Sequence, residues 1–159
     1  MKICRRGLYV QIIDGIGTVR ACSWAGYYIL GNLRDNTMLE VYHSDAAKHF
    51  RQTLLDGTYD YCNEENCPWM ANNMLESQMV EVDEIPKYPQ IISLAYDRRC
   101  NYHCTCCISR CDSMLDPTVQ EKIENEVREA LPYVKNFSAN GLGEVFASEG
   151  MMKLISEWK

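Results

Sequence analysis

Nine cysteines are the residues of this chain whose type and spacing could do chemistry, and they fall into two groups. The later group is compact: three residues separate Cys100 from Cys104, and two separate Cys104 from Cys107. Three thiolates can hold three corners of a [4Fe-4S] cubane and leave one iron open for a substrate or cofactor. The spacing therefore predicts an iron–sulfur site that can take part in chemistry.

The earlier group consists of Cys4, Cys22 and a pair, Cys62 and Cys67, with four residues between its members. Four thiolates brought together would close a cluster fully, which suits electron transfer or a structural role. Zinc is the alternative for both groups, because clustered cysteines bind zinc readily. Unliganded core cysteines are a further alternative for the earlier group.

Composition narrows the class of protein. The 159 residues are 47% hydrophobic and carry a net charge of -6, which argues against a surface that neutralises nucleic-acid phosphates. Neither a signal peptide nor a membrane-spanning run is visible in the sequence. Cysteines clustered in a reducing compartment more often bind metal than form disulfides. We therefore expect a cytoplasmic globular protein with metal-binding cysteines.

The later cysteines are expected to lie in a loop between a strand and a helix. The apolar run 91–96 predicts a buried parallel strand, and the cysteine-rich loop follows it. Asp116-Pro117 predicts the start of a helix that ends at Pro132. A second strand is predicted over 134–139, and Ser148 should begin a last helix. The order strand, helix, strand, helix implies parallel strands with crossover helices.

The earlier cysteines flank a different set of elements. Alternating residues from Leu8, with the turn Asp14-Gly15-Ile16-Gly17, predict a β-hairpin ending near Cys22. Short helices are predicted over 37–43 and 44–55. We predict two domains, residues 1–75 and 91–159, joined by an acidic and proline-containing linker at 76–90.

The segment Leu94-Ala95-Tyr96-Asp97-Arg98-Arg99-Cys100-Asn101-Tyr102-His103-Cys104-Thr105-Cys106-Cys107 resembles the signature of the radical S-adenosylmethionine (radical SAM) superfamily. Ser138-Ala139-Asn140-Gly141-Leu142-Gly143-Glu144 resembles that superfamily's Gly-Gly-Glu element. The resemblance implies that Cys100, Cys104 and Cys107 hold the cluster, and that Gly141, Gly143 and Glu144 hold the amino group of S-adenosylmethionine. Cys106 stands where the superfamily usually has an aromatic residue. No catalytic residue is assigned.

The first half resembles the SPASM and twitch auxiliary-cluster domains that accompany many radical SAM enzymes. The resemblance rests on Cys4, twelve residues, Gly17, four residues and Cys22, and on the later pair Cys62 and Cys67. It implies one auxiliary [4Fe-4S] cluster on these four cysteines, and hence two clusters in the chain. The expected fold class is α/β: a small α+β SPASM/twitch-like domain, then about two βα units of a partial radical SAM barrel.

By these resemblances the chain is a fragment or component of an oxidoreductase that reductively cleaves S-adenosylmethionine to a 5'-deoxyadenosyl radical and modifies a peptide or protein. The implied partners are that substrate, an electron donor such as flavodoxin or ferredoxin, and a second chain that completes the barrel. We expect no turnover by this chain alone. The alternative is a non-catalytic accessory module that binds iron–sulfur clusters, zinc or a peptide.

Overall fold

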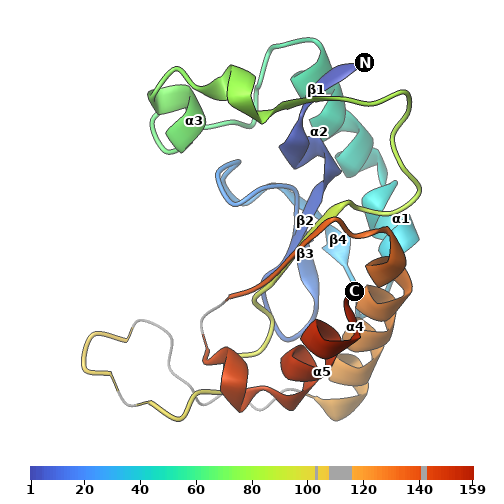
Figure 1. Cartoon of the computed structure of the whole chain (residues 1–159), viewed down its shortest axis with the longest axis vertical. Coiled ribbons are helices and arrows are strands. Elements are labelled where there is room, and N and C mark those ends of the chain that lie inside the picture. Colours follow the sequence, from blue (N-terminus) through green and yellow to red (C-terminus); the bar gives the residue numbers. More distant parts are fainter. Residues whose placement is uncertain (103, 108–115, 141–142) are drawn as a thin grey trace.

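The computed structural model describes residues 1–102, 104–107, 116–140 and 143–159, and shows two small sheets with helices packed against them (Figure 1). The strands are β1 (Lys2–Cys4), β2 (Tyr9–Ile12), β3 (Thr18–Arg20), β4 (Ile29–Asn32), β5 (Met79–Glu81), β6 (Ile91–Leu94) and β7 (Asn136–Ala139). The α-helices are α1 (Met38–Tyr42), α2 (Asp45–Leu55), α3 (Pro68–Ala71), α4 (Pro117–Ala130) and α5 (Glu149–Glu157). Short 3-10 helices are η1 (Arg5–Leu8), η2 (Leu75–Gln78), η3 (Leu131–Tyr133) and η4 (Val145–Ala147).

The larger sheet has the strand order β4-β3-β2-β6-β7. β4, β3 and β2 are antiparallel neighbours, whereas β2, β6 and β7 run parallel. The register places Gln11 beside Ser93 and Ser93 beside Ser138. In the second sheet β1 pairs antiparallel with β5. Strands from both halves of the chain therefore share one sheet.

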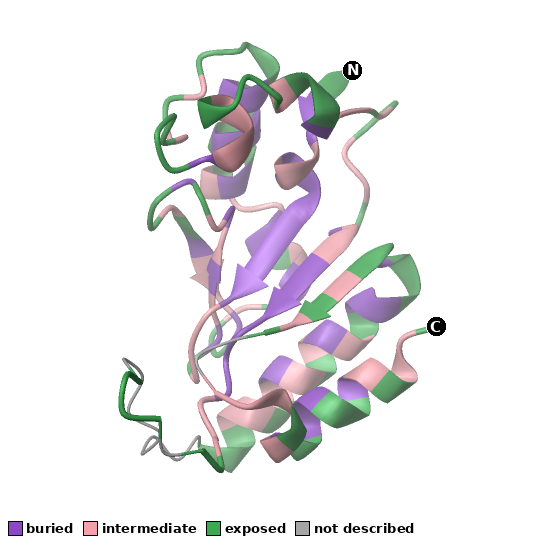
Figure 2. Ribbon diagram, turned by 60° about the vertical axis from the view of Figure 1, so that its left-hand side comes forward, coloured by how far each residue is buried: buried purple, intermediate pink, exposed green. Residues whose placement is uncertain are grey.

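The two faces of the parallel strands differ in chemistry, because side chains alternate along a strand. Val10, Ile12, Ile92 and Leu94 point to one face and are fully buried. They join a single core with Ile123 and Val127 of α4 and Met151 and Leu154 of α5. Figure 2 shows the buried strands at the centre, with α4 and α5 lying against them. Burial of this apolar face holds the helices on the sheet.

The opposite face of the same strands is polar. Tyr9 and Gln11 on β2, Ser93 on β6, and Asn136 and Ser138 on β7 lie along it and line one hollow. A sheet with one apolar and one polar face commonly packs one side on the core and leaves the other for solvent or ligand. This polar face borders the hollow lined by the first cysteine group.

Local signals explain why the elements begin where they do. The hydroxyls of Ser44 and Ser148 accept hydrogen bonds from backbone N–H groups at 3.1 and 3.2 Å, capping α2 and α5. The Asp116 carboxylate accepts from Thr118 N at 2.9 Å and begins α4. In the hairpin turn, the Asp14 carboxylate accepts from Thr18 N at 2.9 Å, and Gly17, just before Thr18, has a φ of 73°. Only glycine adopts this backbone conformation freely.

The predicted hairpin, the two early helices, the strand after residue 90 and the helices after Asp116 and Ser148 are all confirmed. β6 and β7 are parallel and α4 lies between them in the chain, as predicted. The second strand begins at Asn136, two residues later than its predicted start, because Leu131–Tyr133 continue from α4 as a 3-10 helix. The coarse α/β class is confirmed, whereas the partial barrel stays a prediction.

The segment 76–90 is more ordered than a plain linker. It begins within η2 and contains β5, which pairs with β1. The division into domains at 1–75 and 91–159 stays a prediction, and β2 pairs with β6 across it. None of the helices within the described ranges is long and apolar enough to span a membrane.

Candidate iron–sulfur sites

The four cysteines of the first group line one hollow. Cys4 ends β1, Cys22 follows β3, Cys62 lies in the loop after α2, and Cys67 caps the start of α3. The remaining lining is mostly apolar or aromatic: Arg6, Trp24, Ala25, Phe50, Leu54, Tyr59, Trp69, Met70 and Leu75. These cysteines are free thiols. The fold thus brings together four residues that lie up to 63 positions apart in the chain.

Burial and mutual repulsion raise the pKa of three of these thiols, those of Cys4, Cys22 and Cys62. Burial is the main cause that raises the pKa of Cys4 and of Cys22. Burial, together with the charges that Cys22, Cys4 and Cys67 would carry, raises the pKa of Cys62 to about 12. A metal centre is bound by cysteines in their thiolate form, so its binding here would release the thiol protons.

The donor set fits a [4Fe-4S] cluster, which takes four thiolates in a largely apolar surround. The cavity measures about 20 Å³, so a cluster enters only if the lining side chains move apart. Within the ranges that the structure describes, no three His, Cys, Asp or Glu side chains are arranged to hold a single metal ion. Zinc remains the alternative occupant.

The second cysteine group lies in an irregular segment after β6. Cys100 is partly buried, whereas Cys104 and Cys107 are exposed. The N–H of Cys107 donates to the carbonyl of Cys104 at 3.1 Å, which closes a turn. The N–H of Tyr102 donates to the Cys100 sulfur at 3.4 Å. The three thiols are therefore carried on a surface loop, as the sequence predicts.

A buried ionic network anchors the base of this loop. The Asp97 carboxylate accepts from the Arg99 guanidinium at 2.6 Å and from the Ser148 hydroxyl at 2.5 Å. Burial alone would raise the pKa of Asp97, but these donors outweigh it and lower the pKa below its usual value. The Asp97 side chain is fully buried. Through these hydrogen bonds, Asp97 joins the segment that follows β6 to Ser148 at the start of α5.

Of the residues predicted to hold S-adenosylmethionine, Gly143 and Glu144 lie beside this loop. The N–H of Glu144 donates to the carbonyl of Arg99 at 2.8 Å. The Glu144 carboxylate accepts from Phe146 N at 3.2 Å and caps η4. Gly141 lies outside the described residues. The structure thus brings two of the three predicted residues to the base of the cysteine loop.

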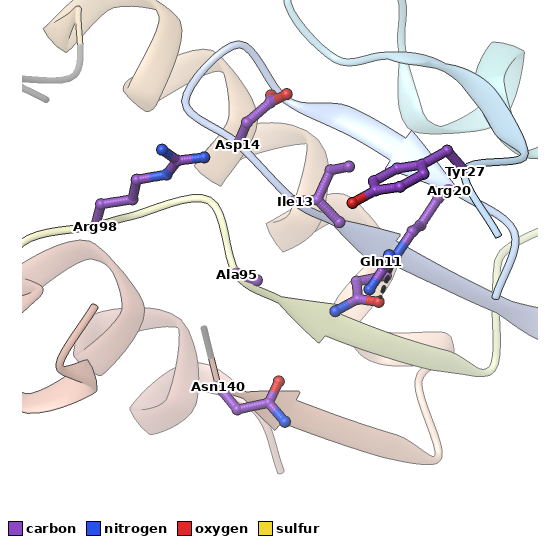
Figure 3. Close-up of a pocket in the computed structure, with 8 residues that line it drawn as sticks. All are labelled: Gln11, Ile13, Asp14, Arg20, Tyr27, Ala95, Arg98 and Asn140. Atoms are coloured by element: carbon purple, nitrogen blue, oxygen red, sulfur yellow. Dashed lines mark hydrogen bonds between the residues drawn. The ribbon is translucent and has the colours of Figure 1, made fainter. Parts of the chain in front are cut away.

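Two open hollows line the polar face of the sheet. The first, about 520 Å³, lies where β2 and β6 end, and Figure 3 shows its lining residues: Gln11, Ile13, Asp14, Arg20, Tyr27, Ala95, Arg98 and Asn140. The second, about 500 Å³, shares Gln11 and Asn140 with it. Volumes of this size are typical of small-molecule or peptide sites. We call the two together the polar groove.

The polar groove borders the four-cysteine hollow and reaches the segment that precedes the second cysteine group. At one end it shares Arg6, Trp24 and Trp69 with the four-cysteine hollow. At the other end Arg98 lies two residues before Cys100. Sequence reasoning found the cysteines but not the groove. Its residues come from four strands (β2, β3, β6 and β7), from α3, η1 and η2, and from loops, and the pairing of β2 with β6 brings the two halves of this lining together.

Residues 4–68 match the SPASM family, an iron–sulfur cluster-binding domain. No curated protein and no solved structure matches the chain. The SPASM match includes all four cysteines of the first hollow. The match agrees with the SPASM resemblance predicted for the first segment, and SPASM domains bind iron–sulfur clusters. The radical SAM core stays a prediction.

Proposed function

We propose that this chain is an iron–sulfur component of a radical SAM enzyme that modifies a peptide or protein. Its first site, on Cys4, Cys22, Cys62 and Cys67, would hold a closed [4Fe-4S] cluster. Its second site, on Cys100, Cys104 and Cys107, would hold a [4Fe-4S] cluster with an open iron. When bound there, S-adenosylmethionine supplies one-electron cleavage chemistry.

The observation that carries this proposal is the polar groove, which runs from the four-cysteine hollow to Arg98 in the segment that precedes Cys100. A substrate lying in it would contact Arg6 and Trp69 near the first site and Arg98 near the second. Its polar lining offers hydrogen-bond partners from the side chains of Gln11 and Asn140. An extended peptide has the backbone groups to use such partners.

The chain's own residues would position the cofactor. The Asp97 network holds the base of the cysteine loop, and the adjoining Gly143-Glu144 backbone is hydrogen-bonded to Arg99 through the N–H of Glu144. Gly143 lacks a side chain, which lets this backbone lie against the carbonyl oxygens of Arg99 and Asp97, and Glu144 supplies a carboxylate that can accept from an amino group. Electrons would come from a small donor protein such as flavodoxin or ferredoxin.

The test is anaerobic reconstitution with iron and sulfide, followed by addition of reductant and S-adenosylmethionine. We expect 5'-deoxyadenosine to accumulate in the wild type and to be absent in Cys104→Ala. Cys106→Ala is the matched control, because Cys106 lies in the same exposed loop but outside the predicted ligand set. Reconstituted protein that binds iron at both sites yet yields no 5'-deoxyadenosine would favour the accessory-module alternative.

A further inference from the structure

Arg6 lies where the four-cysteine hollow meets the polar groove, and it lines both. Its guanidinium carbon lies 4.6 Å from the centre of the Tyr9 ring and 5.0 Å from that of Trp69. Cation–π contacts with two rings hold the charged group in one place. Arg5, its neighbour in η1, lines the groove but not the hollow.

One donor of Arg6 is unused. The Arg6 Nε atom is buried and finds no hydrogen-bond partner within the described part of the chain. An unsatisfied buried donor is costly, and such groups in native proteins call for an acceptor. Among the side chains that line this hollow, the cysteine sulfurs and the Tyr59 hydroxyl could accept a hydrogen bond. The unpaired donor could therefore serve an anionic group bound in the hollow.

Arg6 and the four cysteines line the same hollow, so the field of the guanidinium acts on the space between the sulfurs. The same field would act on any anionic centre bound by these sulfurs. When such a centre accepts one electron it gains one negative charge, and a nearby cation stabilises that reduced state. Hydrogen bonds to the sulfurs have the same effect.

We propose that Arg6 is a positioning residue that raises the reduction potential of the cluster held by Cys4, Cys22, Cys62 and Cys67, through its fixed charge and its unpaired Nε–H. This inference rests on the proposed function, since it assumes that a [4Fe-4S] cluster occupies the hollow. Because Arg6 also borders the polar groove, a ligand bound in the groove beside Arg6 should change the reduction potential of the cluster.

The experiment uses the full chain with Cys100, Cys104 and Cys107 changed to alanine, so that only the first cluster is present. The potential of that cluster is measured by anaerobic redox titration followed by electron paramagnetic resonance. Arg6→Gln removes the charge, Arg6→Lys keeps it, and Arg5→Gln removes the neighbouring charge as the matched control. At a fixed solution potential, Arg6→Gln should lower the ratio of reduced to oxidised cluster at least tenfold, about 59 mV for one electron.

Arg6→Lys should lie between the wild type and Arg6→Gln, and Arg5→Gln should stay near the wild type. Equal shifts in Arg6→Gln and Arg5→Gln, or no shift in either, would overturn the inference. Loss of iron binding in both Arg6 variants would also overturn it, because Arg6 would then be needed to build the site. Failure of the unsubstituted Arg6 protein to bind iron would instead contradict the proposed first cluster.

Discussion

Gly143 lies directly against the carbonyl oxygen of Arg99. A Cβ atom added to Gly143 would stand 2.6 Å from that oxygen and 2.7 Å from the carbonyl oxygen of Asp97. Both neighbours are backbone atoms, which cannot turn aside as a flexible side chain can. The contact joins the loop after β7 to the base of the loop that carries the second cysteine group. It links the two motifs predicted to take part in cofactor binding.

Gly143→Ala should therefore separate the two loops. We expect the free energy of unfolding to fall by about 1–3 kcal/mol, and binding of S-adenosylmethionine to the reconstituted protein to weaken. Urea unfolding and equilibrium dialysis measure the two effects. Gly57→Asn is the control, since an added Cβ at Gly57 meets nothing within 4 Å and asparagine tolerates its φ of 77°. Unchanged stability and cofactor binding in Gly143→Ala would show that the contact is unimportant.

Asp97 should make the fold sensitive to acid. Its carboxylate has a pKa below the usual value of about 3.9, because Arg99 and Ser148 outweigh the effect of burial. The folded state binds this proton less readily than the unfolded state, so the stabilisation is present above about pH 4 and disappears as the pH falls below the folded pKa. Asp97→Asn should lose roughly 1–3 kcal/mol near neutral pH.

The difference in unfolding free energy between wild type and Asp97→Asn should shrink as the pH falls toward about 2. Urea unfolding across that range measures it. The exposed residue Asp83 supplies the control, because Asp83→Asn should leave the pH dependence of the wild type in place. A difference that is independent of pH would mean that the charge of Asp97 does not contribute.

Arg51 should stabilise the fold by joining α2 to η1 and to the end of α1. Its side chain is buried, and it donates to the carbonyl of Gly7 at 2.9 Å and to the carbonyl of Tyr42 at 2.7 Å. Arg51→Met leaves both carbonyls without that donor and should cost roughly 2–4 kcal/mol of unfolding free energy. Lys48→Met, on the exposed side of the same helix, should change it by less than about 0.5 kcal/mol. Similar losses in both variants would refute a specific role for Arg51.

The two cysteine groups should bind clusters independently. Cys104→Ala should abolish binding of S-adenosylmethionine and leave the spectrum of the first cluster unchanged, because the four-cysteine hollow contains none of the residues of the second loop. Cys62→Ala should do the reverse. Absorption and electron paramagnetic resonance spectra of reconstituted protein distinguish the two. If either substitution removed both clusters from folded, soluble protein, the assignment of two sites would be wrong.

Local chemistry explains what the sequence could predict. The Asp14 turn, the Asp116-Pro117 start and the helix start at Ser148 each depend on residues within a few positions, and each is found where expected. The four cysteines of the first site were also found, because their spacing carries a family pattern. These features need no knowledge of distant contacts.

Distant contacts explain what the sequence could not predict. Nothing near Tyr9 indicates that it will lie beside Ile91, yet that parallel pairing creates the polar groove. The proposed role of Arg6 depends on its contact with Trp69, which lies 63 positions later in the chain. Arg6 by itself is an ordinary surface residue type with no motif around it. Such relationships come from tertiary packing alone.

The most direct test of the central claim is the metal content of the anaerobically reconstituted chain. Iron, acid-labile sulfide and zinc would be measured together, with Mössbauer spectra to identify the cluster type. Two four-iron cubanes predict about eight irons per chain, falling to about four in Cys62→Ala and in Cys104→Ala. Stoichiometric zinc without iron in the wild-type protein would contradict the account.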